Sequence, residues 1–331
     1  MDDAAILVSA VVVHLGKTEL LRECLDSLNR SRGIERVETI VVDNASGTPD
    51  LEQLVTGYPN TRIIQLQKRS GYPAASNAGI RASRGRYILW CNNDLVFEPN
   101  AIEYLVRFLE THPGYGAAGP QLLNPDGSYQ PSFSMINMDL KTLLVDRLGL
   151  AALLPGWDLN RHWRGRESTP QDVAVGTGAC CLIRRNALEE VGGMDERFYM
   201  YSEEFDLCLR LWQKGWRVRY VPEARVIHLG GQTTAKTSHV FLLQSWRSRY
   251  AYLRKHSGAM SETVLATAVV AGGFARYGLA WLLKIAAVIM GKPEMASIYR
   301  DKMSFHAALI RLSITPDRHM ADKLQNFARP S

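Results

Sequence analysis

Two clusters of acidic residues stand where an expected strand or loop meets the next element. The first, Asn92–Asp94, closes the apolar run Tyr87–Cys91, and the second, Glu203–Asp206, opens an amphipathic helix. A carboxylate at the carboxyl end of a buried strand lies where open α/β sheets bind ligands, and an acid on a helix N-terminus can face the same crevice. Such groups can hold a divalent metal and remove a proton. The pattern predicts an enzyme that acts on charged, metal-chelated substrates.

Asp94 is the candidate metal ligand of the first cluster. A nucleoside diphosphate leaving group needs a hard divalent cation, and Mg²⁺ or Mn²⁺ usually takes one or two protein carboxylates together with phosphate oxygens. Asn92 and Asn93 precede this aspartate and can add hydrogen bonds to the same ligand. His228 ends a late apolar strand ahead of a Gly-Gly turn and is a second candidate ligand, although a histidine in this place is also common as a structural residue.

Glu203 and Glu204 occupy the expected first turn of the second cluster's helix, and Asp206 follows them. Acids in a first turn complement the positive end of the helix dipole, which by itself contributes about 0.3–1 kcal/mol. Two adjacent glutamates and an aspartate exceed that need. We expect a glutamate of this group to act as general base toward an acceptor hydroxyl, a role that contributes about 10²–10⁴ in rate.

Two polar segments nearer the N-terminus are candidate contacts for a nucleotide. Asp43 and Asn44 end the second expected strand, where an aspartate can accept a hydrogen bond from a nucleobase imide or a ribose hydroxyl. The small-residue segment Gly71–Gly79 begins a helix that a ligand can approach closely, so that Asn77, and Arg69 before it, can contact a nucleotide. Each segment also has a structural interpretation, as a polar turn in the first case and as tight helix packing in the second.

Apolar and helical patterns alternate along much of the chain. Apolar, β-branched runs predict strands, at residues 6–13, 37–42, 62–66, 87–91, 216–221 and 225–229. Helical periodicity predicts helices, at residues 18–29, 73–83, 100–110 and 202–214, the first with Thr18 as N-cap. Ordered structure is also expected at 173–183. Strand-helix alternation implies an α/β fold with a mainly parallel sheet flanked by helices.

The composition is that of a folded globular protein. Of the 331 residues, 46% are hydrophobic and 22% are charged, which argues against disorder. The five cysteines are odd in number and show no Cys-x-x-Cys spacing, so a reducing cytosol is expected rather than a disulfide framework. The N-terminal apolar stretch lacks the basic region and cleavage site of a signal peptide and is expected to be the first strand.

A charge change near residue 235 predicts a boundary between a domain of residues 1–235, with a loop-rich insertion at about 121–170, and an extension of residues 236–331. The extension has 14 Lys and Arg against 5 Asp and Glu, a net +9 that leaves −3 for the preceding residues. It also carries apolar stretches at 264–274 and 277–290, broken by Arg276 and Lys284.

Neither apolar stretch reaches the roughly 20 residues of a spanning helix. We therefore expect the extension to place a surface-lying or re-entrant helix on anionic lipid, and we expect no nucleic-acid partner. The alternative is that this helical extension forms a pair of core helices packed on the main domain. Periodicity alone does not distinguish a membrane-surface helix from a buried one.

Six motifs along roughly residues 6–256 resemble glycosyltransferase family 2, and most of all its bacterial rhamnosyltransferase-like branch. They are Val41–Ser46, Gly71–Gly79, Asn92–Asp94, Gly176–Cys180, Phe198–Arg210 and His228–Gly231. The resemblance implies a GT-A fold, a nucleotide-sugar donor, Mg²⁺ or Mn²⁺ as cofactor, and inverting transfer by a single displacement. It further implies that Asp43 contacts the nucleotide, that Asp94 holds the metal, and that Glu204 is the base.

The resemblance favours dTDP-rhamnose or a UDP-sugar as donor, and a lipid-linked glycan or growing surface polysaccharide as acceptor. The cysteine pattern and the basic, apolar extension predict a cytoplasmic chain that is peripheral at the inner face of the plasma membrane. Trp157, Trp163, Tyr199 and Tyr201 can stack on sugar faces of the acceptor, or else pack in the core.

Two other classes of function remain as alternatives. A nucleotide-dependent oxidoreductase is disfavoured because the first strand runs into His14–Glu19 and not into a Gly-x-Gly-x-x-Gly turn. A catalytically silent family member that assembles at the membrane stays open, because the acidic motifs depart from the family pattern at Asn92 and Glu204.

Overall fold

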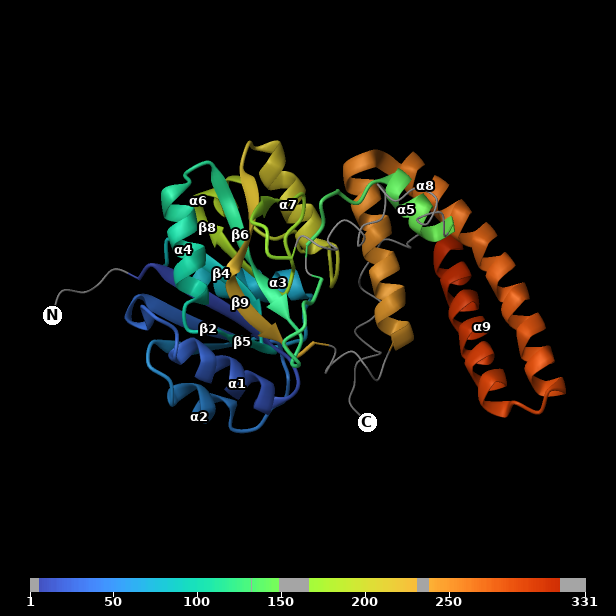
Figure 1. The fold of residues 1–331 in the computed structure, drawn as a ribbon, viewed down its shortest axis with the longest axis horizontal. Helices are drawn as coiled ribbons and strands as arrows, with labels where there is room; N and C mark the ends of the chain where they lie inside the picture. The colour runs from blue at the N-terminus through green and yellow to red at the C-terminus, as the bar shows by residue number, and fades with distance from the viewer. Residues whose placement is uncertain (1–5, 132, 149–166, 231–237, 316–331) are drawn as a thin grey trace. The chain divides into compact units, whose positions relative to one another are not determined.

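The computed structural model describes residues 6–131, 133–148, 167–230 and 238–315, and the chain divides into two compact units (Figure 1). The first unit comprises Met1–Asn137 and Leu159–Lys236, and the second comprises Met138–Asp158 and Thr237–Ser331. Part of the segment that the sequence marks as an insertion thus belongs with the C-terminal helices.

A sheet of nine strands, counted over the described residues, forms the centre of the first unit. Its order is β3-β2-β1-β4-β8-β6-β9-β5, with β7 paired to β9. The β3-β2-β1-β4 half is parallel, whereas β8, β5 and β7 join their neighbours antiparallel and β6 runs parallel to β9. The strands are β1 Val8–His14, β2 Val37–Asp43, β3 Thr61–Gln65, β4 Tyr87–Asn92, β5 Leu95–Phe97, β6 Tyr115–Leu123, β7 Gln171–Asp172, β8 Cys180–Arg184 and β9 Arg217–His228.

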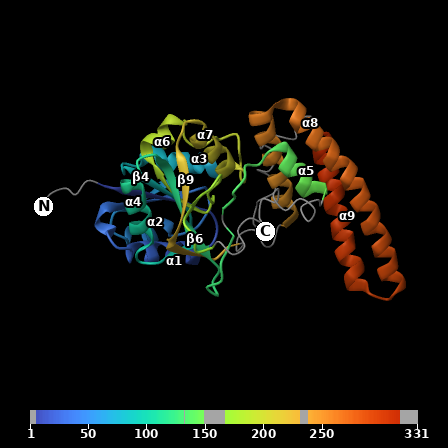
Figure 2. The same ribbon diagram turned by 45° about the horizontal axis from the view of Figure 1, so that its top comes forward.

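Helices cover both faces of this sheet (Figure 2). One core contains Val8, Ala10 and Val12 of β1 and the other contains Val11 and Val13, because successive side chains of a strand point to opposite faces. The first core is closed by α1 Thr18–Asn29, α2 Leu51–Thr56 and α4 Ala101–Thr111, and the second by α3 Tyr72–Ala82, α6 Arg185–Glu190 and α7 Glu203–Gln213.

Three local expectations differ from the structure. Thr18 is the first residue of α1 and not its N-cap, because Lys17 takes the extended cap conformation and makes no side-chain cap bond. The two late strands are one strand, β9, in which residues 222–224 form a bulge against β6, where the register moves from Val221 to Arg225. Of residues 173–183, strand structure is confined to the part within β8.

The second unit contains three described helices, α5 Leu140–Leu148, α8 Ser238–Ile289 and α9 Pro293–Ile314. Gly258, at φ 84° and ψ 169°, kinks α8, and its later part runs beside α9 as a helical hairpin (Figures 1 and 2). Arg276 does not interrupt α8. Its guanidinium donates to the carbonyl of Arg147 in α5 at 2.6 Å.

The continuity of α8 corrects the expectation that no segment of the extension reaches spanning length. Among the described residues, α8 is long and apolar enough to cross a membrane by length and composition, and only 28% of its most apolar stretch is buried. The expectation was wrong because it counted the two apolar stretches separately.

Candidate active site

Three strands of the first unit end at the same edge of the sheet. The parallel register pairs His14 with Asp43 and Val13 with Asn92. The carboxyl ends of β1, β2 and β4 therefore meet, and Asp94 follows two residues after the end of β4. This is the edge at which open α/β sheets bind ligands.

The register of β5 brings Asp94 to His228. Leu95 lies opposite His228 in the antiparallel β5-β9 pair, and the amide of Leu229 donates to the Asp94 carbonyl at 2.9 Å. The His228 Nε2 atom consequently lies 3.3 Å from Asp94 Oδ1, although 134 residues separate the two in sequence. Both side chains are largely buried.

Gln130 orients this histidine and was not predicted from the sequence. Its amide nitrogen donates to Asn124 Oδ1 at 3.0 Å, which turns its oxygen toward His228 Nδ1 at 2.6 Å. The Nδ1 proton therefore goes to Gln130, and Nε2 presents a lone pair toward Asp94. No local pattern marks Gln130, because its partners lie 6 and 98 residues away.

The Asp94 and His228 pair has the chemistry of a partial metal site. Asp94 Oδ1 is buried without a hydrogen-bond donor, and a lone pair 3.3 Å away requires a proton or a cation between the two atoms. A carboxylate oxygen and an imidazole nitrogen are ligands that Mn²⁺ accepts, whereas Mg²⁺ prefers oxygen. Among the described residues no three His, Cys, Asp or Glu side chains converge on one point, so the remaining ligands would come from a bound diphosphate.

A strained turn presents Glu203 and Glu204. Tyr201 and Ser202, just before α7, both have left-handed backbone conformations, with φ of 70° and 67°. Non-glycine residues take this conformation at a cost of about 1–3 kcal/mol each, and such strain is concentrated at functional sites. The turn places Glu203 in a buried position, 5% exposed, and leaves Glu204 half-buried.

Burial raises the proton affinity of both glutamates. It lifts the pKa of Glu204 to about 7. The pKa of Glu203 is held well above its usual range by burial and by the neighbouring charge of Glu204, and its Oε2 atom is buried without a hydrogen-bond partner. Near neutral pH the pair can therefore accept a proton, which is the property of a general base.

Tyr72 links the glutamates to the metal-binding edge. Burial raises its pKa well above the usual range, and the charges of Glu203 and Asp94 both add to that shift. Its hydroxyl donates to the carbonyl of Gly178 at 3.4 Å, and a Cβ atom at Gly178 would lie 3.6 Å from Glu204 Oε2. Tyr72, another residue that sequence reasoning missed, is thus close enough to both acidic clusters for their charges to act on its hydroxyl.

The start of α3 packs against the loop that carries the glutamates. The amide of Tyr72 donates to the Tyr199 carbonyl at 2.7 Å, and a Cβ atom at Gly71 would lie 2.8 Å from Tyr199 Cα. Only glycine allows this approach. The positive charge of Arg69 acts on the Tyr199 hydroxyl, whose pKa burial raises, and burial together with Glu203 and Glu204 raises the pKa of Tyr201 to about 12.

The predicted donor-binding residues Asp43 and Asn93 make different contacts at the strand ends. Asp43 Oδ1 accepts from the Ser46 amide at 2.9 Å, which is the turn chemistry expected of it, and the side chain stays at the edge. Asn93 Nδ2 lies 3.0 Å from His14 Nδ1. Burial lowers the pKa of His14, and the nearby charge of Asp43 opposes this shift only in part. The ring is therefore neutral near pH 7 and lies between Asp43 and Asn93.

Two of the residues predicted to bind the donor make hydrogen bonds that support the fold. Asn44 accepts from the Ser70 amide at 2.8 Å and donates to the Ser70 carbonyl at 2.9 Å. Asn77 donates to the carbonyl of Met194 and accepts from its amide. Both amides tie loops together, and the predicted donor-binding role of these two residues stays a prediction.

Asp206 also has a supporting contact, and its predicted catalytic role stays a prediction. It is fully buried and forms an ion pair with Arg210, whose Nε donates to Asp206 Oδ2 at 2.8 Å. Arg210 Nη1 also donates to the carbonyls of Val191 and Gly193. The pair fastens α7 to the loop after α6. Trp157 and Trp163, the other acceptor candidates, lie outside the described residues.

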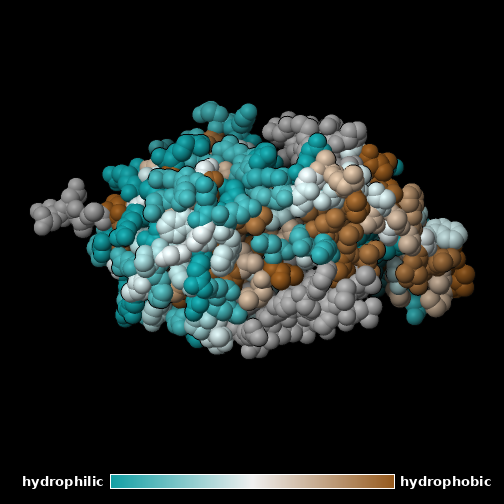
Figure 3. Space-filling view, turned by 90° about the horizontal axis from the view of Figure 1, so that it is seen from above, coloured by the Kyte–Doolittle hydropathy of each residue, from teal (hydrophilic) through white to brown (hydrophobic). Residues whose placement is uncertain are grey.

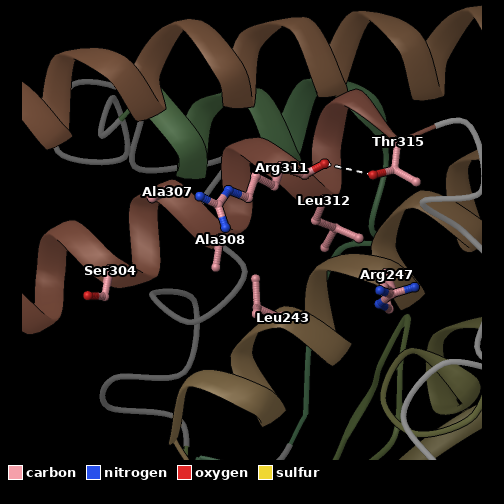
Figure 4. Close-up of a pocket in the computed structure, with 8 residues that line it drawn as sticks. All are labelled: Leu243, Arg247, Ser304, Ala307, Ala308, Arg311, Leu312 and Thr315. Carbon is pink, nitrogen blue, oxygen red and sulfur yellow. Dashed lines mark hydrogen bonds between the residues drawn. The ribbon is translucent and has the colours of Figure 1, made fainter.

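The second unit has a cavity of different character. It measures about 500 Å³ and is lined by residues of α8 and α9, namely Leu243, Arg247, Ser304, Ala307, Ala308, Arg311, Leu312 and Thr315 (Figure 4). Its described lining offers two guanidinium groups and apolar walls but no carboxylate. These lining residues therefore offer no carboxylate for proton removal or metal binding.

The chain belongs to glycosyltransferase family 2, because the model described as Glycosyl transferase family 2 matches residues 9–192, more than half of the sequence. A model described as Glycosyl transferase family group 2 matches residues 150–310. Within the family the chain lies in the rhamnosyltransferase-like branch. The prediction of family and branch is confirmed.

Two curated relatives illustrate the branch. The N-acetylglucosaminyl-diphospho-decaprenol L-rhamnosyltransferase of Mycobacterium tuberculosis (strain CDC 1551 / Oshkosh) is 34% identical over 243 residues, which cover 67% of this chain and 76% of that protein. The O-antigen biosynthesis protein RfbC of Myxococcus xanthus is 30% identical over 67% of this chain but only 17% of its own length.

A solved structure shows the same fold. The mannosyltransferase PcManGT from Pyrobaculum calidifontis, in complex with GDP-Man and Mn²⁺, superposes with a TM-score of 0.55 at 17% identity, over 92% of this chain and 84% of that one. The GT-A fold expected from the sequence is confirmed, and the chain is a glycosyltransferase that acts in glycan biosynthesis.

Proposed function

We propose that this chain is an inverting glycosyltransferase that moves a sugar from a nucleoside diphosphate sugar to a hydroxyl of a lipid-linked or polysaccharide acceptor. The observation that carries the proposal is the close Asp94 and His228 pair, together with Tyr72, whose hydroxyl contacts Gly178 beside Glu204 and is acted on by the charges of Asp94 and Glu203. The relatives support dTDP-rhamnose as donor, because one of them is named for rhamnosyl transfer, with a UDP-sugar as the alternative.

Glu204 takes the proton of the acceptor hydroxyl in the proposed reaction. The oxygen then forms a bond to the anomeric carbon while the bond from that carbon to the diphosphate oxygen breaks on the opposite face, so the configuration inverts. The proton stays on Glu204, and the electron pair leaves with the nucleoside diphosphate. Because Glu204 must be ionised to act, and its pKa lies at about 7, the rate should rise with pH through neutrality.

Asp94 and His228 would hold Mg²⁺ or Mn²⁺, with Gln130 fixing the imidazole so that Nε2 faces the metal. When bound, such an ion neutralises charge on a diphosphate leaving group. Asp43, Asn93 and Arg69 are the proposed contacts to the nucleotide, because they lie at the strand ends and on the loop before α3.

The acceptor side of the proposed site lies around the strained turn. Tyr199 and Tyr201 flank the glutamates and present aromatic faces on which a sugar can stack. A lipid-linked acceptor fits the name of the mycobacterial relative, which includes a diphospho-decaprenol. It also fits a peripheral position at the inner face of the plasma membrane, where the second unit would meet lipid.

Replacement of Glu204 by Gln tests the base assignment. We expect Glu204→Gln to lower transfer by about 10²–10⁴ while a nucleotide sugar with Mn²⁺ still raises the melting temperature, since binding to the native state stabilises it. Glu223→Gln, the same change at an exposed position of β9, is the matched control.

Transfer by Glu204→Gln at the rate of the control would remove the base assignment. Nucleotide-sugar binding without transfer by the wild-type chain, across a panel of lipid-linked acceptors, would instead favour the silent assembly partner.

A further inference from the structure

The later part of α8 carries large apolar side chains on its outside. The lipid-facing surface, as we define it, consists of the exposed apolar residues between positions 274 and 290, with exposures from 36% to 79%, namely Phe274, Tyr277, Leu279, Trp281, Leu282, Leu283, Ile285, Val288, Ile289 and Met290. Brown atoms gather over α8 and α9 in the space-filling view (Figure 3). A soluble monomer rarely exposes such a continuous apolar patch.

The inside of the hairpin carries small residues. Gly273, Ala280 and Ala287 recur at seven-residue spacing along one stripe of α8 and are buried. A Cβ atom at Gly273 would lie 2.7 Å from Ile310 of α9, so the two helices approach very closely there. Ala296 of α9 is buried as well. This arrangement, with small residues between helices and large apolar ones outside, is typical of helices packed in lipid and opposite to that of a water-soluble hairpin.

The charges of the second unit favour an anionic partner. Residues 238–315 contain 10 Lys and Arg against 3 Asp and Glu, a net +7. Lys292, Arg300 and Lys302 are exposed on or just before α9, beside the apolar surface. Basic groups next to a buried apolar face are what attract an amphipathic helix to a bilayer that contains anionic lipid.

The same charges decide against a spanning orientation. Lys292, Glu294, Arg300 and Asp301 are all exposed, within about two turns of the α8-α9 connection. In a spanning hairpin Arg300 and Asp301, about two turns along α9, would lie near the hydrocarbon centre at a cost of several kcal/mol, whereas an in-plane helix leaves all four charges among the headgroups. Tyr277 and Trp281 are the residue types that settle at that level.

We propose that the lipid-facing surface of α8 inserts shallowly, parallel to the membrane plane, into one leaflet of an anionic bilayer. The membrane contact of the proposed function would thus be made by α8, with the helix lying parallel to the membrane. Only residues of the second unit take part in it. An apolar face on one leaflet would also keep the first unit beside lipid-linked acceptors without a transmembrane anchor.

Co-flotation of the full chain with vesicles tests the surface. We expect binding to vesicles of phosphatidylcholine with phosphatidylglycerol, and weaker binding to phosphatidylcholine alone. Because burying one large apolar side chain is worth roughly tenfold or more in partition, the triple variant Trp281→Ser, Val288→Ser, Ile289→Ser should bind at least about 100-fold more weakly. The double variant Leu242→Ser, Ile314→Ser removes exposed apolar side chains outside the surface and should bind like the wild type.

Quenching by brominated lipids tests the depth. The difference in fluorescence between the wild type and Trp281→Phe isolates Trp281 from the other six tryptophans. Bromines near the headgroup should quench this signal more than bromines deep in the acyl chain, and the reverse order would overturn the in-plane orientation.

Two results would overturn the lipid assignment itself. One is equal flotation of the triple variant and the control. The other is a wild-type chain that self-associates in sedimentation equilibrium without lipid and becomes monomeric in the triple variant, which would assign the surface to a second copy. Transfer to a soluble acceptor analogue should survive in the triple variant, so a failure of the proposed enzyme activity is recognised separately from a failure of lipid binding.

Discussion

Two regions of the first unit contain buried polar side chains of the same chemical types but treat them in opposite ways. In the supporting region, formed by Asn44, Asn77 and the Asp206 and Arg210 pair, the carboxylate and amide groups meet protein partners. In the reactive edge, formed by Asp94, His228, Glu203 and Glu204, Asp94 Oδ1 and Glu203 Oε2 are buried without a hydrogen-bond partner. Buried polar atoms normally find partners, so we propose that a bound ligand supplies them to the carboxylates of the reactive edge.

The largest effect is expected from breaking the supporting region. Asp206→Asn removes the negative member of a buried ion pair and leaves the Arg210 charge uncompensated, which should lower the free energy of unfolding by about 3–5 kcal/mol. Urea denaturation measures this change, with Glu223→Gln as control. A variant of normal stability that had lost its transfer rate would instead move Asp206 to the reactive edge.

A smaller but specific loss is expected at the metal-binding end of the edge. Asp94→Asn keeps the shape of the side chain and removes its charge, so the stability should stay near that of the wild type while kcat falls by about 10²–10³, the loss usual for one charge-stabilising group. Titration with Mn²⁺ should show weaker binding in parallel. An unchanged response to Mn²⁺ would show that the metal is held elsewhere.

Gln130 allows a sharper comparison, because on the His228 ring it contacts Nδ1 and not the Nε2 atom that faces Asp94. Gln130→Ala should weaken Mn²⁺ binding by about 10–100-fold, the usual effect of losing a partner that orients a metal ligand. Gln130→Glu retains an oxygen acceptor for the His228 Nδ1 proton and should restore most of the affinity. If both variants bind Mn²⁺ like the wild type, His228 is not oriented by this contact.

The smallest effect is a gain in stability at Glu203. Its pKa is raised in the folded state, so above pH 4.5 the unfolded chain releases this proton more readily and the carboxyl destabilises the fold increasingly as pH rises toward the folded pKa. Glu203→Gln should therefore melt like the wild type near pH 4 and be more stable by at least about 1 kcal/mol near pH 8. Equal differences at both pH values would point to packing and not to charge.

Much of the first unit could be predicted from the sequence because its signals are local. Apolar runs gave β1 to β4 within two residues at each end, and the periodic stripe of α1 gave both of its ends. The antiparallel strand β8 and the continuous β9 were less visible, because pairing direction and bulges depend on partners distant in sequence.

The candidate site shows the same division. Asp94 and the glutamates carry local signals, namely a strand end and a helix start. No local signal predicts the contact of Asn77 with Met194, because the two residues are 117 positions apart in sequence. Tyr72 and Gln130 were missed for the same reason, as each acts through a contact made by the tertiary fold. The metal-ligand and base roles themselves remain proposals.

The close approach of Gly71 to Tyr199 has a mechanical consequence. The segment at Gly71, on the proposed nucleotide side, is in direct backbone contact with the segment at Tyr199, which leads to the proposed base. No side chain lies between the two segments to absorb a displacement. A displacement on the donor side would therefore be transmitted directly to the loop that carries the glutamates. Alignment of the two reaction partners would then be a property of one rigid joint and not of two independently adjusted loops.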